Sequence, residues 1–588
     1  MWSSRELAII RLVRKRSVAV ALFVLTAAVA AAKDTHEPDA QGSPAAGKTP
    51  APPPMVDDPI DVLYRRSLLM DETGEPVATI RLMEGQTTIR VRVPSGRLAI
   101  TPRSAPDEPV RRIKAPSGTT VVLSLIEHSP GAVLRFPIVA ELPAGMISHA
   151  AVVEEVARWR NRGHEVRLET VGSVFGLGGE VLDNRRVLVL LDGPGSIGWA
   201  REAAEEASSY LMQSPVFHEV RTERPSASIG VSDSEGSVLA VADGHVLIEV
   251  RGGEVVEVLG VEHSVGYARH GREDRLFEGS LHVVVDDLGL SLVNEVAVEK
   301  MLRGIVPAET YASAHIEALK AQAVATRTDI LAKVGVRHQA DPALICAETH
   351  CQVYRGVGAA VGTTDDAILS TAGEVLVGDG GRLIDAVYSA MCGGHTESNE
   401  TVWGTPPDPV LRGRLDLPVE GKWLRFAAGI GEAELEKWLA EDPPSWCRLA
   451  SVGSNSRHRW TRSFTAEQID GLVSSLGVGS IRAIEPLGRG VSGRVRGVRV
   501  TGTGGEAVVR RELPVRRLFD NLPSGMFVVR VEEDEKGLPV SFVFEGGGWG
   551  HGVGMCQTGA IGMAEHGHAY RSILRHYYNG AEVQSICR

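Results

Sequence analysis

The sequence predicts a multidomain α+β protein, and three observations support this fold class. A chain of 588 residues is longer than a single hydrophobic core usually serves. Residues 135–225 show strand-like and helix-like patterns in the order βαββαβ. From residue 228 onward a strand-rich stretch gives way to mixed helices and strands, and the clearest helix is the Ala-rich run from Ala314 to Leu331. We therefore expect several domains that each combine helices with strands.

The charge of the chain argues against two classes of function. The formal net charge is -12 at pH 7. Such a balance provides no overall basic surface for nucleic acid. It also lacks the polybasic surface that holds a protein on anionic membranes. We expect neither nucleic acid nor a lipid surface as a partner of the folded part.

The N-terminus has the pattern of an export signal. An uncharged, mostly apolar run from Ser17 to Ala32 follows a basic stretch that contains Arg11, Arg14, Lys15 and Arg16. The run is shorter than the roughly 20 residues that a spanning helix usually needs. We predict a signal peptide over residues 1–32 and a product exported to the periplasm or cell envelope. The alternative, an uncleaved signal, would be the one contact with a membrane.

Two segments of simple pattern follow the signal. Residues 33–58 are rich in Pro, Ala and Gly without apolar periodicity, which predicts an extended linker. Residues 59–130 contain short alternating runs such as VATIRLMEG, TTIRVRVPSG and TTVVLSLIE. This alternation between turns predicts a small β-rich module.

Residues 135–225 predict a ferredoxin-like βαββαβ unit. RFPIVAEL, HEVRLETVG, RRVLVLLDG and FHEVRTER have strand patterns, and helix-like runs follow the first and the third. With AVVEEVARWRNRGHEVRLETVG inside it, the segment is similar to SPOR-type domains, which bind bare glycan strands of the bacterial wall. An unrelated α/β sandwich is the alternative.

Glu309 is the first candidate for chemistry. It lies in GIVPAET, and we expect Pro307 to force an extended or turn segment just before it. Lys320 and Arg327 on the next helix are seven residues apart and therefore share a face. The local pattern alone fits a capping carboxylate and a surface ion-pair set equally well.

The second candidate is a group of metal-ligand side chains. HQADPALICAETHCQVYRG contains two Cys and two His, namely His338, Cys346, His350 and Cys351. These types match a tetrahedral zinc set, although the spacing is not that of a common zinc finger. A Cys346–Cys351 disulfide is the alternative in an exported protein. Cys392 and His395, in YSAMCGGHTES with Ser389, could replace His338 as ligands or line a site.

The third candidate is the glycine-rich stretch GGGWGHGVGMCQTG. Its glycines surround Trp549 and His551, which would let backbone approach a ligand closely or adopt positive φ. Gln557 offers both a donor and an acceptor for sugar hydroxyls or amides. A glycine-rich turn outside a strand–helix nucleotide context is weak support for phosphate binding.

These motifs together carry a resemblance to a known family. IVPAE, the EALKAQAVATRT helix, CAETHCQVY, CGGHTES with VWG, GHGVGMCQTGAIGMAEHG and HYYNGAEV follow one another in the order typical of stage II sporulation protein D and the amidase enhancers. The resemblance covers residues 228–588, with an inserted middle segment at about 405–540. It implies a mixed α+β domain with an active-site groove.

The resemblance implies a lytic transglycosylase that cleaves peptide-free peptidoglycan strands. Glu309 would be the general acid and base, and this chemistry requires no cofactor. A raised pKa would suit the acid role. Lys320 and Arg327 would be positioning groups for the substrate, and Ser389, His395, His551 and Gln557 would line the groove.

The resemblance also favours zinc over a disulfide at His338, Cys346, His350 and Cys351. His338 is the outlying ligand because it is farther from Cys346 than the family pattern predicts. Cys556 stands where the family often has Ser, and we expect a small wall residue there. One rival interpretation is a non-catalytic activator of a cell-wall amidase, which would then be a partner. Another is a structural wall-anchoring protein, which leaves His551 without a role.

Overall fold

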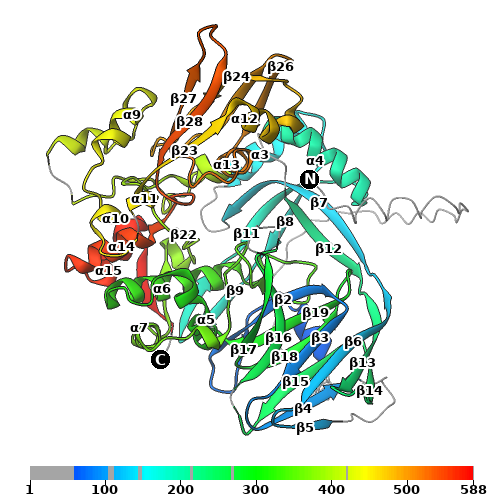
Figure 1. The fold of residues 1–588 in the computed structure, drawn as a ribbon. Helices are drawn as coiled ribbons and strands as arrows, with labels where there is room; N and C mark the ends of the chain where they lie inside the picture. Colours follow the sequence, from blue (N-terminus) through cyan, green and yellow to red (C-terminus); the bar gives the residue numbers. More distant parts are fainter. Residues whose placement is uncertain are drawn as a thin grey trace, which may run out of the picture. The chain divides into compact units, whose positions relative to one another are not determined.

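The computed structural model describes residues 58–103, 112–143, 149–211, 216–253, 255–265, 270–418, 421–453 and 455–586 (Figure 1). The predicted signal peptide, residues 1–32, and almost all of the predicted linker, residues 33–58, lie outside these ranges. In the part of the chain that is described, no helix is both long and apolar enough to cross a membrane.

Two large sheets form the first part of the fold. The eight-stranded sheet has the order β1-β2-β19-β18-β15-β4-β5, and β20 pairs with β2. The six-stranded sheet has the order β14-β13-β6-β3-β16-β17. The strands of the first sheet are β1 (Leu69–Met70), β2 (Pro76–Gln86), β4 (Arg97–Pro102), β5 (Ile113–Pro116), β15 (His245–Arg251), β18 (Ser280–Val285), β19 (Leu290–Ala297) and β20 (Ile345–Cys346). Those of the second are β3 (Thr88–Arg92), β6 (Thr120–Ser129), β13 (Ser226–Asp233), β14 (Val238–Asp243), β16 (Val256–His263) and β17 (Gly271–Phe277).

The side-chain patterns of these strands explain their positions. Along β3, Ile89 and Val91 are buried whereas Thr88 and Arg90 are exposed. This alternation gives the strand one face toward the core and one toward solvent. In β18 nearly every residue is buried, as expected for an inner strand that is covered on both faces.

Residues 59–130 do not form the separate β module that was predicted. β2 pairs with β19 and β6 pairs with β13, so strands from both sides of residues 132–223 complete the same two sheets. Their side chains share one core, in which Ile80 and Leu123 lie with Val231 and Leu292. Local alternation identifies such strands but contains no information about distant pairing partners.

The segment between these strands forms a four-stranded antiparallel sheet with two helices. Its order is β12-β7-β11-β8. The elements are β7 (Ala132–Pro143), α3 (His149–Arg160), β8 (Val166–Val171), β11 (Arg186–Leu191), α4 (Ile197–Leu211) and β12 (Phe217–Glu223). Trp159 is fully buried among Val139, Leu142 and Leu191. The hairpin of β9 (Val174–Leu177) and β10 (Glu180–Asp183) was not expected from the sequence.

The helical part of the fold is built around α6 (Ile316–Lys333). Helices α14 and α15, red in Figure 1, pack beside this green helix. β22 pairs in parallel with β29, and β21 pairs with β30, so the C-terminal segment returns to residues 374–389. The other elements of this part are α5 (Val298–Glu309), α7 (Gly362–Ser370), β21 (Glu374–Val377), β22 (Tyr388–Ser389), α8 (Asn399–Trp403), β29 (Met555–Cys556), α14 (Gln557–Glu565), α15 (Tyr570–Tyr577) and β30 (Glu582–Ser585). Helix α2 (Pro59–Tyr64) belongs to the first part, because its Leu63 is buried with Val284 and Val293.

Pro307 does not end its helix, contrary to the sequence-based expectation. α5 continues through Pro307 to Glu309, and the Thr310 N–H donates to the Val306 carbonyl at 3.1 Å. Only two helical residues follow Pro307, so the distortion that a proline causes affects less of the helix than it would near the centre. Glu309 is consequently the last helical residue and is held by regular helix geometry.

The predicted middle segment has its own sheets and core. One three-stranded sheet has the order β23-β28-β27, and a second has the order β24-β25-β26. Phe519, Phe527, Phe542 and Phe544 are buried together. The elements are α9 (Glu432–Glu441), α10 (Trp446–Leu449), α11 (Asn455–His458), β23 (Arg459–Thr465), α12 (Ala466–Leu472), β24 (Ile481–Pro486), β25 (Gly497–Gly502), β26 (Gly505–Arg510), α13 (Glu512–Leu518), β27 (Phe527–Glu533) and β28 (Pro539–Gly547).

Asn184 joins the inserted β7–β12 segment to the end of α6. Its Nδ2 donates to the carbonyls of Leu331 and Val334, both at 2.8 Å. Its Oδ1 accepts the Ser173 N–H at 2.8 Å. The side chain is buried, so water cannot replace these bonds without rearrangement.

We predict that Asn184→Ala destabilises the protein by about 1–3 kcal/mol, because it leaves buried backbone groups without partners. The measurement is the midpoint of thermal or urea unfolding. Asn161→Ala is the matched control because Asn161 is exposed on the same segment. Equal midpoints for the two variants would contradict the role assigned to Asn184.

Candidate functional site

Glu309 lies at the end of α5 and is partly buried. Its Oε1 accepts the Val353 N–H at 3.2 Å. Its backbone carbonyl accepts Nε2 of Gln557, the first residue of α14, at 2.8 Å. The same Nε2 donates to Gln322 Oε1 at 3.2 Å. The structure therefore brings Glu309 and Gln557 together, as predicted, although through the main chain of Glu309.

The surroundings of Glu309 raise its pKa from 4.5 to about 7. Burial is the main cause, and the negative charge of Asp329 adds to it. The Val353 N–H, Lys333 and Arg355 act in the opposite direction. A carboxyl group with this pKa is present in both protonation states near neutral pH. It can therefore donate a proton and later accept one.

Asp329 is buried, and its Oδ2 is held by two neighbouring side chains. Its Oδ2 accepts Nε2 of Gln352 and Nζ of Lys333. Lys333 Nζ also donates to the Cys351 carbonyl at 2.8 Å. The Tyr388 hydroxyl donates to Gln352 Oε1 at 2.6 Å. Asp329 thus acts on Glu309 through its charge, while its Oδ2 binds Gln352 and Lys333.

His551 positions the backbone of Tyr388. Its Nδ1 accepts the Val553 N–H at 3.0 Å, which leaves the proton on Nε2, and Nε2 donates to the Tyr388 carbonyl at 2.9 Å. The ring packs on Trp403 with centroids 5.2 Å apart. Burial lowers the pKa of His551 to about 3. The imidazole is therefore neutral, and its hydrogen bond holds the backbone of β22 in place.

The glycines around His551 permit close packing of backbone. Gly548, Gly550, Gly552 and Gly554 all have φ between 69° and 97°. A Cβ on Gly554 would come within 2.1 Å of a backbone carbonyl oxygen of residue 387. Most of these glycines thus pack against the chain at residues 387–392, whereas the sequence had led us to expect a ligand there.

The other predicted groove residues are buried. The Ser389 hydroxyl accepts the Gly552 N–H at 3.2 Å, which ties β22 to the glycine-rich loop. His395 has no exposed surface, and its Nδ1 lies 2.7 Å from the Thr396 carbonyl. Burial lowers the pKa of His395 to about 4. Both side chains support the loops, and neither is placed on an open surface.

Lys320 and Arg327 have partners other than Glu309. Lys320 Nζ donates to Glu317 Oε1 at 2.8 Å and lies 5.8 Å from the centroid of the Tyr570 ring. Arg327, only 1% exposed, makes two hydrogen bonds of 2.6 and 2.7 Å to the carboxylate of Glu299. These contacts join α6 to α15 and α5.

The geometry of α6 explains this arrangement. Lys320 and Arg327 share a face, as the sequence predicted. Gln322 and Asp329, which surround Glu309, also share a face, but each lies two residues farther along the helix. Two residues correspond to a rotation of about 200°, so the two pairs point in nearly opposite directions. The structure therefore does not bring Lys320 and Arg327 together with Glu309.

Two exposed aromatic rings, one of them close to Glu309 in the sequence, meet through an arginine. Tyr311 follows Glu309 by two residues and is 39% exposed, and Trp549 is 38% exposed. The Arg457 guanidinium lies 5.1 Å from the Trp549 ring centroid and donates to the Tyr311 hydroxyl at 3.3 Å. Exposed aromatic rings beside an arginine can bind flat ligand faces. Sequence spacing gave no signal for Arg457.

The four predicted metal ligands lie together. One ligand atom from each of His338, Cys346, His350 and Cys351 lies within 4.8 Å of the others. His338 Nε2 is 3.2 Å from Cys351 Sγ, and His350 Nδ1 is 3.5 Å from the same sulfur and 3.8 Å from Cys346 Sγ. Tetrahedral zinc places nitrogen and sulfur ligands about 3.6 Å apart. Both thiols are free.

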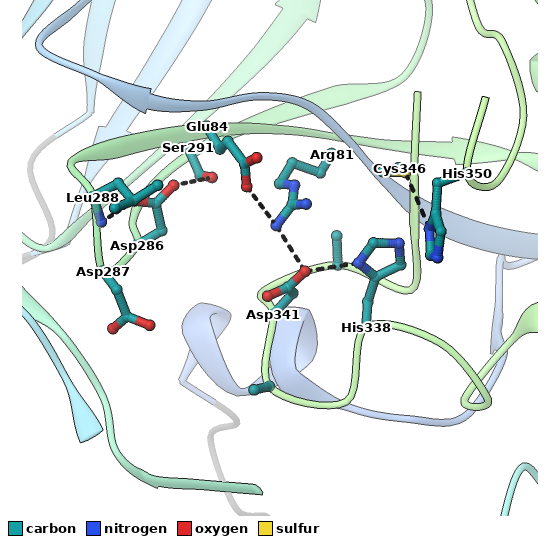
Figure 2. Close-up of polar contacts among 12 residues, drawn as sticks. Arg81, Glu84, Asp286, Asp287, Leu288, Ser291, His338, Asp341, Cys346 and His350 are labelled. Carbon is teal, nitrogen blue, oxygen red and sulfur yellow. Dashed lines mark hydrogen bonds and ion pairs between the residues drawn. The ribbon is translucent and has the colours of Figure 1, made fainter. Parts of the chain in front are cut away.

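A carboxylate orients His338 within this cluster. His338 Nδ1 lies 2.7 Å from Asp341 Oδ2, so Nε2 is free to face the thiols. Arg81 pairs with Asp341 at 2.7 Å and with Glu84 at 3.0 Å (Figure 2). A histidine held by a carboxylate on its far nitrogen is typical of zinc sites. His338, which the sequence singled out as the outlying ligand, thus lies with the other three.

Two regions of the chain match known families. Residues 286–377 match the family described as "Stage II sporulation protein". Residues 397–554 match the "Domain of unknown function (DUF8618)". The first match contains Glu309 and the His/Cys cluster, and the second covers the middle segment with the start of the glycine-rich loop.

Several curated relatives are similar to part of the chain. An uncharacterized protein of Brachyspira hyodysenteriae is 28% identical over 345 residues, which are 58% of this chain and 81% of that protein. The amidase enhancer of Bacillus subtilis is 29% identical over 299 residues, 48% of this chain and 40% of that protein. Stage II sporulation protein D of Bacillus amyloliquefaciens is 25% identical over 328 residues, 53% of this chain and 81% of that protein.

We predict a pH-dependent stability difference between the wild type and Glu309→Gln. Ionisation of Glu309 is opposed by burial, so wild-type stability relative to the variant is highest below pH 4.5 and falls as the pH rises to about 7. The variant should therefore gain in thermal midpoint against the wild type between pH 4 and pH 8. A pH-independent difference would contradict the raised pKa.

Glu317→Gln is a matched control with the opposite sign. Burial alone would raise the pKa of Glu317, but hydrogen bonds from Lys320 and the Tyr570 N–H lower it overall. The charge of Glu317 therefore stabilises the fold above pH 4.5, and this contribution is lost as the pH falls through its folded-state pKa. This variant should lose stability at pH 8 and approach the wild type in acid.

Proposed function

Since the chain belongs to the family of stage II sporulation protein D and the amidase enhancers, we propose that it acts in the bacterial cell envelope as a peptidoglycan lytic transglycosylase. The observation that carries this proposal is the carboxyl group of Glu309. It is partly exposed, and its pKa is raised to about 7. The proposed substrate is a glycan strand that has been freed of its peptides.

Glu309 would act as acid and base in one reaction. The protonated carboxyl group donates its proton to the glycosidic oxygen as the bond from that oxygen to C1 of the muramic acid breaks. The C6 hydroxyl of the same sugar then bonds to C1, and its proton passes to the Glu309 carboxylate. The products are an anhydro-muramic end and a free hydroxyl on the leaving sugar, and Glu309 is again protonated.

The state of Asp329 favours this single-carboxylate reaction. Ordinary glycosidases use two carboxyl groups, one on each side of the bond that is cleaved. Asp329 raises the pKa of Glu309, but it is buried and its Oδ2 binds Gln352 and Lys333. It is thus poorly placed to activate a water or attack a sugar. A nucleophile within the substrate removes the need for a second carboxylate.

Other groups would bind and orient the strand. Gln557 holds the main chain of Glu309, and His551 holds that of Tyr388, so both fix the geometry around the acid. Trp549, Tyr311 and Arg457 provide an exposed surface for sugar rings. Lys320, Arg327 and His395 are more suitably assigned to packing, because their polar groups face other protein residues or are fully buried.

We further assign glycan binding to the inserted segment of residues 132–223. The strand order β12-β7-β11-β8, with helices after the first and third strands, supports the ferredoxin-like SPOR-type interpretation. A binder of bare strands beside an enzyme that cuts them would raise the local substrate concentration.

We also propose that His338, Cys346, His350 and Cys351 bind a structural zinc ion. The four ligand atoms fit a tetrahedral set, and Asp341 holds His338 in the required orientation. The ion would cross-link the loop that contains Val353, whose N–H donates to Glu309. A site with four protein ligands has no open position for a substrate, so its contribution is to stability.

The decisive experiment for the enzyme uses peptide-free glycan strands. We expect the mature protein to release products with anhydro-muramic ends, identified by mass spectrometry. Glu309→Gln should slow cleavage by about 100-fold or more while strand binding persists, because the acid is lost. Glu317→Gln should retain activity, since Glu317 lies with Lys320 on the other side of α6. Products with reducing ends would mean that water is the nucleophile, and would overturn the transglycosylase.

Activation of a cell-wall amidase is the second candidate function, and the similarity to the amidase enhancer of Bacillus subtilis favours it. It would be supported if the wild type and Glu309→Gln both bind strands, neither cleaves them, and both stimulate an amidase equally. Cleavage by the wild type alone would exclude it as the sole function.

For the zinc site, we expect Cys351→Ser to lose one zinc ion per chain and to unfold at a lower temperature. Asp341→Asn should weaken zinc binding by about 10- to 100-fold through the orientation of His338. Metal content and thermal midpoint are the measurements, and neither requires activity. A Cys346–Cys351 disulfide in non-reducing peptide maps would contradict the proposal.

A further inference from the structure

A second group of metal-ligand side chains lies in the core below the glycine-rich loop. Cys392, Asp416, Cys447 and Cys556 each offer one ligand atom, and all four atoms lie within 4.8 Å of one another. Each residue is at most 3% exposed. They come from four segments separated by up to 164 residues. The fold therefore brings this group together, and no single stretch of sequence predicts the whole set.

The distances fit metal ligands better than a disulfide. Cys392 Sγ lies 3.7 Å from Cys447 Sγ and 3.0 Å from Asp416 Oδ2. Tetrahedral zinc with bonds to sulfur of about 2.3 Å places two sulfurs about 3.8 Å apart. A disulfide requires about 2.05 Å.

Backbone N–H groups point at two of the sulfurs. The Gly394 N–H donates to Cys392 Sγ at 3.3 Å. The N–H groups of Cys392 and Gly559 donate to Cys556 Sγ, both at 3.2 Å. A neutral thiol is a weak acceptor, whereas a thiolate is a strong one. These donors are therefore suited to sulfurs that carry negative charge.

Side chains in contact with the ligands orient the other two. His576 Nε2 lies 2.9 Å from Asp416 Oδ1, which leaves Oδ2 toward the thiols. The Ser445 hydroxyl lies 3.4 Å from Cys447 Sγ and 2.8 Å from His458 Nε2. Such outer partners are typical of metal sites because they fix the ligands in position.

Gly559 packs directly against two of the ligands. A Cβ on Gly559 would come within 2.8 Å of Asp416 Oδ2, 3.1 Å of Cys556 Sγ and 2.2 Å of the Tyr577 hydroxyl. Glycine is thus the residue that leaves space beside the ligands. Three buried thiolates beside a buried carboxylate would carry more negative charge than the His576 ring, 2.9 Å from Asp416, could offset, and a divalent ion would balance it.

We propose that Cys392, Cys447, Cys556 and Asp416 bind a second zinc ion. Three thiolates with one carboxylate in a closed four-ligand site favour zinc, since the carboxylate suits it better than the softer Cu(I). Binding releases the thiol protons to solvent. Zinc binding here would require neither the proposed catalytic activity nor the first His/Cys cluster.

The second zinc would connect the middle segment to the catalytic part. Asp416 and Cys447 belong to the middle segment, Cys392 follows β22, and Cys556 caps α14. The residue after Cys556 is Gln557, whose side chain holds the Glu309 carbonyl. The ion would thus fix the start of α14, and with it the position of the proposed acid.

The test is a zinc count on the full chain from which the export signal has been removed, purified under reducing conditions. We expect two zinc ions per chain in the wild type. Cys447→Ser should retain one, Cys351→Ser should retain the other, and the combined variant should retain none. One zinc in the wild type with no change in Cys447→Ser would overturn the proposal.

A measurement on the wild type keeps the test decisive if the variants fold poorly. Cys392, Cys447 and Cys556 should resist alkylation under mild unfolding conditions and become reactive after zinc chelation, as mapped by mass spectrometry. Cobalt substitution of Cys351→Ser should still show thiolate-to-metal charge-transfer bands. A Cys392–Cys447 disulfide in the non-reduced protein, or alkylation unaffected by chelation, would refute the site.

Discussion

Burial of α6 on all its faces is the constraint on which the arrangement around Glu309 depends. The helix buries polar side chains together with its alanines, and each buried polar group must find a partner. Arg327 binds Glu299 on α5, Gln322 binds Gln557 on α14, and Asp329 binds Gln352. These partners belong to the segments that surround the carboxyl group. The helix therefore determines where α5, α14 and the His/Cys loop can lie.

The electrostatic properties of Glu309 follow from this packing more than from any dedicated side chain. Its pKa is raised chiefly because it is desolvated, while its carboxylate accepts only the Val353 N–H among the hydrogen bonds of the described residues. That N–H belongs to a residue two positions after Cys351, one of the proposed zinc ligands. The acid and the first metal cluster are thus parts of one structural unit, linked by backbone.

Much of the site could be predicted from the sequence because its motifs are local. The Ala-rich helix, Glu309, and the set of His338, Cys346, His350 and Cys351 are each found within a short stretch. The orientation of α6 could not be predicted, because a buried helix has no polar face to indicate its direction. Lys320 and Arg327 share a face, as the sequence predicted, but this face is turned away from Glu309. His551 was expected to line the substrate groove, whereas in the structure its Nε2 binds a backbone carbonyl on β22.

For the fold as well, local elements could be predicted from the sequence, whereas contacts between distant segments could not. The βαββαβ order of residues 135–225 and the strands of residues 59–130 were predicted from alternation and turns. The pairing of β2 with β19 was not, since it joins strands on either side of the inserted segment. The clustering of Cys392, Asp416, Cys447 and Cys556 was not predicted for the same reason. Cys392 and Cys556 lie in motifs that the sequence singled out, but their grouping with Asp416 and Cys447 depends on how the middle segment packs.

The nesting of one unit inside two sheets has a consequence for the order of assembly during synthesis. The strands before residue 130 emerge from the ribosome long before β13 to β19, which complete their sheets. Until then their edges are open and their apolar faces are uncovered, which favours wrong pairing. The inserted unit, whose strands are close in sequence, can fold first because its loops are short. Its early folding would bring the two ends of the interrupted sheets together, so the insert can act as a template for the domain that contains it.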